Sequence, residues 1–202
     1  MIFMKNTVSF MVILAMLFCV SICFGADTKA GTSSNPIVVI ETTKGNITVE
    51  LFKDKAPKSV ENFLEYVKAG YYNGTIFHRV IKNFMIQGGG FTEDMAKKPG
   101  LRAPIENEAT NGLKNEVGTI AMARTNEINS ATSQFFISTK HYESLDHRGS
   151  TADLFGYAVF GKVTDGMSVV YKIESVETGT KSGNDDVPTN AVTIKSVHLK
   201  GE

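Results

Sequence analysis

Short runs of β-branched and aromatic residues recur along most of this 202-residue chain, separated by turn-forming Gly, Asn and Pro residues. Alternating apolar and polar positions, clearest at Ile47, Val49 and Leu51, are typical of strands buried on one face. The runs predict eight strands: Ile37–Thr42, Asn46–Phe52, Thr75–Ile81, Phe84–Gln87, Thr119–Ala123, Gln134–Ser138, Tyr157–Val163 and Val192–Leu199. So many short strands favour a barrel or a sandwich.

Only two segments have a helical pattern. In Pro57–Gly70 the apolar residues Val60, Phe63, Leu64 and Val67 recur at helical spacing, Pro begins the segment and Gly ends it. A second, shorter helix is predicted over Gly166–Ser175, with Thr164 or Asp165 as its N-cap. Long polar segments separate several of the strands, and loops of that length in a compact domain are usually functional.

The first 25 residues read as a targeting segment. Lys5 is their only charge, and an apolar stretch follows it up to Gly25. This pattern predicts a secretory signal peptide over 1–25, cleaved after Gly25. Two alternatives remain open, a retained membrane anchor and a lipoprotein modified at Cys23. A polar leader is predicted over 26–36, and a single folded domain over 37–200.

Removal of this segment changes the chemistry that the chain can perform. Cys19 and Cys23 are the only cysteines, so the remaining chain has no disulfide, no thiol nucleophile and no cysteine metal site. Loss of Lys5 from a chain of net charge zero leaves one acidic residue in excess. Nucleic-acid binders usually carry a basic excess, so this balance argues against a nucleic-acid partner.

Familiar catalytic motifs are missing. Gly179–Ser182 resembles the end of a phosphate-binding loop but lacks the required glycines, and no Gly-x-Ser-x-Gly elbow occurs. No two histidines have the i, i+4 spacing of a helical zinc site, which argues against a metal. His141 and His147 fall in a predicted loop, where we expect them to be solvated.

One group of residues is unusual for strands. Arg79 lies inside a predicted strand, Phe84, Met85 and Gln87 occupy the next, and Gln134 and Phe136 a later one. Two such strands could present apolar groups and amides to one shallow site with Arg79 nearby. The alternative interpretation is an ordinary ion-paired Arg with two hydrogen-bonded core glutamines.

The residues of these segments and their order along the chain resemble the cyclophilin family of peptidyl-prolyl cis–trans isomerases. The strongest stretches are Phe77–Phe91, Pro104–Arg124, Ser133–Ile137 and Phe155–Val163. Within them, Asn107–Asn115 and Ala121–Arg124 look most like the bacterial branch. The resemblance implies a mainly β fold, a closed antiparallel eight-stranded barrel capped by two α-helices.

The resemblance also implies a site that catalyses rotation of X–Pro bonds without cofactor or metal. Arg79 is expected to be the catalytic hydrogen-bond donor, with His78 beside it in a supporting role. The substrate-binding residues that the resemblance implies are Phe84, Met85, Gln87, Ala123, Arg124, Gln134, Phe136, Leu145 and Tyr157. Ala123 and Arg124 are expected to offer main-chain groups to the peptide.

Two positions depart from the family pattern. Ser144 stands where many members carry Trp, and Tyr157 where many carry His. A weak interaction with the macrocycle cyclosporin is therefore expected, with less effect on isomerisation.

The resulting hypothesis is a secreted or periplasmic prolyl isomerase that assists the folding of exported proteins. Its partners would be proline-containing polypeptides, with no nucleic acid and no membrane after signal cleavage, and it is expected to be a monomer. A non-catalytic proline-peptide-binding module or a chaperone on the same barrel remains the alternative.

Overall fold

The computed structural model describes Met1 and residues 35–201. The predicted signal peptide and most of the predicted leader therefore lie outside the described residues. The strands are β1 (Ile37–Thr42), β2 (Gly45–Leu51), β3 (Phe77–Ile81), β4 (Met85–Gly88), β5 (Thr119–Met122), β6 (Phe135–Ser138), β7 (Val159–Asp165), β8 (Thr178–Lys181), β9 (Asn184–Pro188) and β10 (Ile194–Leu199). The helices are α1 (Pro57–Lys68) and α2 (Met167–Glu174), with the 3₁₀ turns η1 (Ala109–Asn111) and η2 (Glu143–Leu145).

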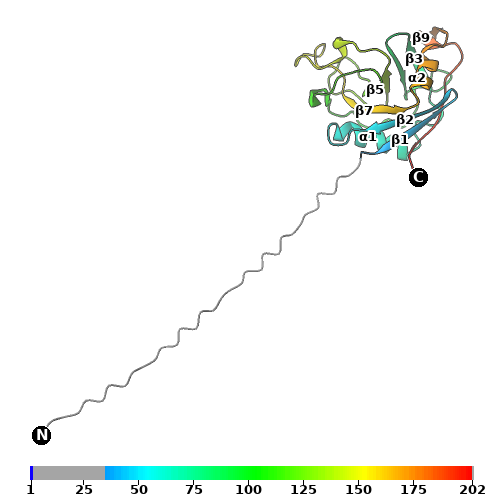
Figure 1. Cartoon of the computed structure of the whole chain (residues 1–202). Helices are drawn as coiled ribbons and strands as arrows, with labels where there is room; N and C mark the ends of the chain where they lie inside the picture. The colour runs from blue at the N-terminus through cyan, green and yellow to red at the C-terminus, as the bar shows by residue number, and fades with distance from the viewer. Residues whose placement is uncertain (2–34, 202) are drawn as a thin grey trace. The chain divides into compact units, whose positions relative to one another are not determined.

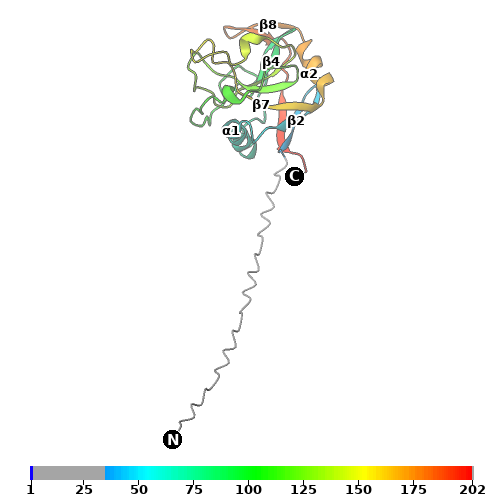
Figure 2. The ribbon, with the colours of Figure 1, turned by 60° about the vertical axis from the view of Figure 1, so that its left-hand side comes forward.

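Eight strands form one curled antiparallel sheet in the order β10-β1-β2-β7-β5-β6-β4-β3. Its two edges meet over a short stretch, where Ile76 and Thr193 form a bridge. Next to this bridge, Ile194 N donates to Thr75 O at 2.7 Å and Phe77 N donates to Val192 O at 2.9 Å. The expected eight-stranded antiparallel fold with two helices is confirmed. Helices α1 and α2 lie apart from each other, and both pack against the core that the curled sheet encloses (Figures 1 and 2).

The main core lies inside the curled sheet. Ile47, Val49 and Leu51 of β2 are all 0% exposed, so the alternation along the sequence marks the buried face. The ring of Phe63 from α1 meets Phe135 of β6 edge-on, with centroids 5.6 Å apart. The apolar side of α1 therefore packs into the core, as its helical pattern predicts.

Helix α1 begins without a side-chain cap of its own. Its N-cap is Ala56, and Pro57 occupies the first turn. The carboxylate of Glu108 takes the place of a cap, since it accepts hydrogen bonds from Lys58 N at 3.0 Å and from Ser59 N at 2.8 Å. Ser59 Oγ donates to the same carboxylate at 2.7 Å. A residue distant in sequence thus satisfies donors that would otherwise be free.

One expectation about local structure was wrong, and one element was not predicted. The N-cap of α2 is Gly166, whose φ of 89° lies in the left-handed region, and neither Thr164 nor Asp165 forms a side-chain cap. Glycine is required there because a Cβ would stand 2.4 Å from Asn46 O. In addition, β8 and β9 form a hairpin that the sequence pattern did not predict, because its residues are mostly polar and exposed. Gly179–Ser182 belongs to this hairpin.

Candidate active site

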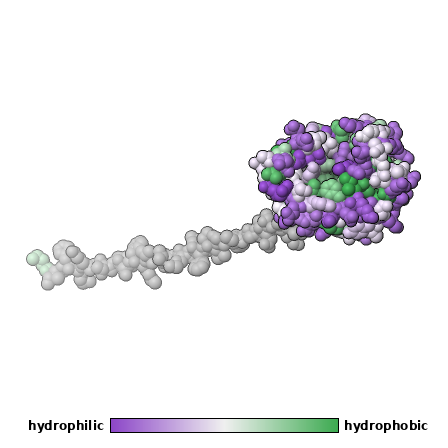
Figure 3. Space-filling view, turned by 90° about the horizontal axis from the view of Figure 1, so that it is seen from above, coloured by the Kyte–Doolittle hydropathy of each residue, from purple (hydrophilic) through white to green (hydrophobic). Residues whose placement is uncertain are grey.

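A cavity of about 580 Å³ lies at the surface and gathers almost all the site residues expected from the sequence. Ten of the eleven line it: His78, Arg79, Phe84, Met85, Gln87, Ala123, Arg124, Phe136, Leu145 and Tyr157. The eleventh, Gln134, lies beside them, because Gln87 Nε2 donates to Gln134 Oε1 at 2.9 Å. On the face that Figure 3 shows, hydrophobic residues gather in the middle and hydrophilic residues surround them.

Strand register places three of these side chains in a row. Arg79 of β3 pairs with Gln87 of β4, and Gln87 pairs with Phe136 of β6. Directly opposite residues of antiparallel strands point to the same face. One cation, one amide and one aromatic ring therefore stand side by side on three neighbouring strands.

The apolar part of the cavity is a separate hydrophobic cluster, distinct from the main core. Met85, Phe136 and Leu145 are between 2% and 9% exposed and pack with Ala121 and Val159. The ring of Tyr157 meets that of Phe136 edge-on, with centroids 5.5 Å apart and an interplanar angle of 84°. Because this cluster borders the cavity, its residues form an apolar slot there. We call Met85, Phe136, Leu145 and Tyr157 the apolar slot.

Arg79 stands at the edge of the slot with its side chain 45% exposed. Its Nε lies 3.7 Å from Asp186 Oδ2 of β9. The ion pair of the alternative interpretation is thus present, but the distance is too long for a hydrogen bond. Among the described residues, this pair uses none of the guanidinium hydrogen-bond donors, so they can serve a ligand in the cavity.

Arg124 is engaged with the protein itself. Its Nε donates to Gly156 O at 3.0 Å, and its guanidinium lies over the Tyr157 ring, 4.9 Å from the centroid. Ala123 N donates to Gln134 O at 3.0 Å. The N–H of Ala123 is therefore not free for a peptide. The expected main-chain contact of Ala123 can then use only its carbonyl oxygen. Arg124 instead holds the Tyr157 wall in place.

His78 is buried next to Arg79. The residue is 6% exposed, and its ring lies 4.6 Å from that of Phe91 between centroids. Burial lowers the pKa of His78 to about 4, with the nearby Arg79 charge acting in the same direction. His78 is therefore neutral at pH 7, which agrees with a supporting position.

One wall of the cavity was not predicted from the sequence. Phe91 and the hairpin residues Gly183, Asn184, Asp185 and Asp186 also line it. No local pattern marks the hairpin, and it reaches the cavity only because β9 lies against β3. Asp186 adopts a left-handed φ of 61°, which Asp tolerates better than most residues.

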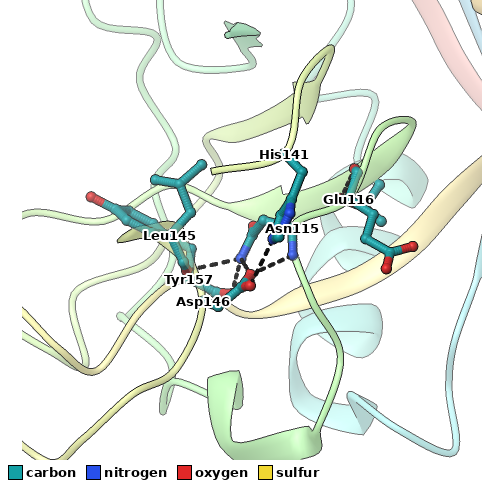
Figure 4. A network of polar contacts seen from close by, with 7 residues as sticks. Asn115, Glu116, His141, Leu145, Asp146 and Tyr157 are labelled. Atoms are coloured by element: carbon teal, nitrogen blue, oxygen red, sulfur yellow. Dashed lines mark hydrogen bonds and ion pairs between the residues drawn. The ribbon is translucent and has the colours of Figure 1, made fainter. Parts of the chain in front are cut away.

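His141 is partly solvated, with its side chain 36% exposed, but it also has a partner that the sequence did not indicate. Its Nε2 lies 2.9 Å from Asp146 Oδ2, and the pair belongs to a network beneath Leu145 and Tyr157 (Figure 4). His147 is exposed, yet its Nδ1 lies 2.8 Å from Phe155 O. Among the residues that the structure describes, no three His, Cys, Asp or Glu side chains are grouped as metal ligands would be. None of the described helices has the length and apolar character needed to cross a membrane.

Comparison with known proteins gives a consistent result. The family model of cyclophilin-type peptidyl-prolyl cis-trans isomerases matches residues 37–199. Peptidyl-prolyl cis-trans isomerase cyp18 of Streptomyces antibioticus is 55% identical over 81% of this chain and 98% of its own length. Peptidyl-prolyl cis-trans isomerase B of Escherichia coli K12 is 51% identical over 80% of this chain and 98% of its own length.

Solved structures agree with the sequence relatives. A cyclophilin-type isomerase of Cryptosporidium parvum superposes with a TM-score of 0.67 at 28% identity, covering 83% of this chain and 99% of that one. A second structure of the Cryptosporidium protein, obtained in the presence of the dipeptide Ala-Pro, gives a TM-score of 0.66 at 29% identity over 82% and 99% of the two chains. The chain described here belongs to the cyclophilin-type family of peptidyl-prolyl cis-trans isomerases and has that activity.

Proposed function

We propose that this isomerase acts on X–Pro bonds of exported proteins, assists their folding, and uses Arg79 as the group that lowers the rotation barrier. The observation that carries the proposal is the row of Arg79, Gln87 and Phe136 on three neighbouring strands. In that row a charged donor stands next to an apolar slot, with an amide between them.

The reaction needs neither a nucleophile nor a cofactor. Resonance across the X–Pro bond gives a rotation barrier of roughly 20 kcal/mol, and the uncatalysed step takes tens to hundreds of seconds. As the bond twists, resonance is lost and the prolyl nitrogen gains a usable lone pair. A hydrogen bond to that nitrogen strengthens only along the twist, so it stabilises the transition state more than the ground state.

Arg79 is suited to this task by its chemistry. A guanidinium stays charged and offers five donors in a fixed plane. The 3.7 Å contact with Asp186 is made through Nε, and within residues 35–201 no hydrogen bond engages the terminal nitrogens. The amide of Gln87 lies directly across the β3–β4 ladder and is held by its own bond to Gln134.

The proposed partner is a proline-containing polypeptide. The apolar slot would hold the proline ring, since Met85, Phe136, Leu145 and Tyr157 form an apolar wall beside Arg79. The Cryptosporidium relative, studied in the presence of Ala-Pro, supports this choice of ligand.

Export is proposed from the N-terminal sequence. Residues 1–25 carry a single charge at Lys5 ahead of an apolar stretch, as secretory signal peptides do. A bacterial periplasm is the proposed location, because Asn107–Asn115 and Ala121–Arg124 resemble the bacterial branch of the family. There the uncatalysed isomerisation of X–Pro bonds would limit the folding of newly exported chains.

The test is the rate of Arg79 variants on a tetrapeptide containing Ala-Pro. We expect Arg79→Ala to lower kcat/KM by roughly 10²–10³, the usual cost of losing one pre-aimed donor. Arg79→Lys should recover little, because a flexible ammonium cannot reproduce the planar fork.

A circular dichroism melt of each variant is the folding control. Near-wild-type turnover by a normally folded Arg79→Ala protein would show that another group lowers the barrier. A wild-type protein that binds the peptide without turning it over would instead support the non-catalytic binding module.

A further inference from the structure

A buried polar network lies beneath the slot, outside the residues assigned to substrate contact (Figure 4). At its centre are Asn115, which is 0% exposed, and Asp146, which is 8% exposed. Asn115 follows η1 and Asp146 follows η2, so the network joins two loops that are separate in the sequence. Asp146 Oδ1 accepts hydrogen bonds from Asn115 N at 2.7 Å and from Asn115 Nδ2 at 3.2 Å.

The same Asn115 amide reaches the backbone of both walls of the slot. Asn115 Nδ2 donates to Leu145 O at 2.8 Å and lies 3.4 Å from Tyr157 O. Tyr157 N in turn donates to Leu145 O at 2.9 Å. The side chains of Leu145 and Tyr157 line the cavity, so this network connects directly to two of the four slot residues.

The second carboxylate oxygen of Asp146, Oδ2, contacts a histidine on the solvent side. His141 Nε2 lies 2.9 Å from Asp146 Oδ2, and the His141 side chain is 36% exposed. Burial alone would raise the pKa of Asp146, but the hydrogen bonds from His141 and Asn115 outweigh it, and the pKa is lowered. The carboxylate is thus ionised at neutral pH and accepts from both sides.

Buried amides and carboxylates stabilise a fold less than apolar side chains of the same size unless their directional bonds are needed. Here Asn115 Oδ1 has no hydrogen-bond partner among the described residues, so the network also tolerates an unsatisfied atom. What it provides is a fixed spacing between two backbones, which apolar packing would define less sharply.

We infer that Asn115 and Asp146 are positioning residues that set the spacing of Leu145 and Tyr157, and through them the fit of the proline ring. The inference rests on the proposed function, which places that ring in the slot. Arg79 and Gln87 lie on β3 and β4, and the polar partners of their side chains are Asp186 and Gln134, outside the network. Among the described residues, no hydrogen bond joins them to Asn115 or Asp146, so we expect the position of the Arg79 donor not to depend on the network. Loss of the network should weaken peptide binding much more than the rotation step.

The main test is Asn115→Leu. This variant roughly keeps the volume of the side chain but removes the Nδ2 donor and with it the hydrogen bonds to Leu145 O and Asp146 Oδ1. Leu145 O keeps its bond from Tyr157 N, and Asp146 keeps the Asn115 N–H and His141. We expect KM for an Ala-Pro tetrapeptide to rise roughly tenfold while kcat stays within about threefold, because a misfit of under an ångström in an apolar pocket costs on this scale. An NMR titration should measure the dissociation constant as well, because KM equals Kd only when chemistry is slow. We expect this Kd to rise in parallel with KM.

Two further variants separate positioning from simple stability. Asn115→Thr keeps one hydroxyl donor and is the milder change, with an expected rise of about threefold in Kd. Glu108→Ala removes the cap of α1, lies outside the cavity lining and should lower the melting temperature without changing Kd.

The outcomes are distinct. Unchanged Kd in both Asn115 variants, whatever their melting temperature, would overturn the inference and leave the network a purely structural one. A fall in kcat at constant Kd would overturn it as well. If instead the wild-type titration shifts no resonances of Leu145 and Tyr157, the peptide does not occupy the slot and the proposed function itself fails.

Discussion

Arg79 and His78 are sequence neighbours on β3, yet their surroundings differ sharply. The Arg79 side chain is 45% exposed at the cavity edge, whereas His78 is 6% exposed beneath it. The β3–β4 register shifts between Phe77 and Arg79, so strict alternation does not hold at His78, and both residues border the cavity although only Arg79 is exposed.

The buried His78 should make stability depend on pH. Its pKa is about 4 in the folded protein and about 6.5 when unfolded, so only the unfolded chain binds the proton between these values. Stability should therefore fall as the pH drops from 6.5 to 4, by roughly 3 kcal/mol from this group. Urea unfolding at pH 7 and pH 4.5 measures the effect.

His78→Phe provides the comparison for that experiment, because Phe fills similar space and does not titrate. The variant should lose much less stability than wild type over the same pH interval. Equal losses in the two proteins would assign the pH dependence to other groups.

Ser144 should weaken cyclosporin binding. The residue is exposed in η2, next to the slot residue Leu145, where many family members carry Trp. A missing aromatic contact is worth ~1–3 kcal/mol, or roughly 5- to 100-fold in affinity. Ser144→Trp should tighten cyclosporin binding by that factor, measured by calorimetry, with little change in kcat/KM. Wild-type affinity equal to that of the variant would contradict this expectation.

At the scale of elements, α1 depends on a cap that comes from another part of the chain. Glu108 is 50 positions from Lys58 and satisfies two N–H groups and one hydroxyl at the start of the helix. Glu108→Ala should lower the free energy of unfolding by about 1–2 kcal/mol, the usual worth of a cap with its charge–dipole interaction.

Glu108→Gln is the matched control for that prediction. It keeps an acceptor oxygen but removes the charge, so it should lose less stability than Glu108→Ala in chemical denaturation. Identical losses would show that hydrogen bonding to the helix start contributes little and that charge dominates.

At the scale of the whole molecule, the family match and the N-terminal segment occupy different parts of the sequence. The family match covers residues 37–199, which leaves the apolar segment of 1–25 outside it. N-terminal sequencing of protein from its native compartment should give a start at or near Ala26, because signal peptidases cleave after small residues. An intact Met1 in a membrane fraction would indicate a retained anchor, and a lipid on Cys23 a lipoprotein.

Much of the architecture could be predicted from local patterns. The alternation in β2 and the helical spacing in α1 predicted which side chains are buried, because each periodicity is a property of a short stretch of chain. Arg79, Phe84, Met85 and Gln87 could likewise be recognised as unusual within their strands. The residue identities of these positions, together with those of later segments, gave the resemblance from which the family was recognised.

The features that could not be predicted from the sequence are contacts between residues far apart in the chain. The β8–β9 hairpin reaches the cavity through β3, Glu108 caps a helix 50 positions away, and Asp146 meets Asn115 across 31 positions. No local periodicity encodes such contacts, because polar loop residues are compatible with many partners until the strands fix their positions. The sequence alone therefore determined the eight strands of the main sheet, the two helices, the family and most of the cavity residues. The tertiary structure decided where the β8–β9 hairpin lies, which polar groups support the slot and which residues face Arg79.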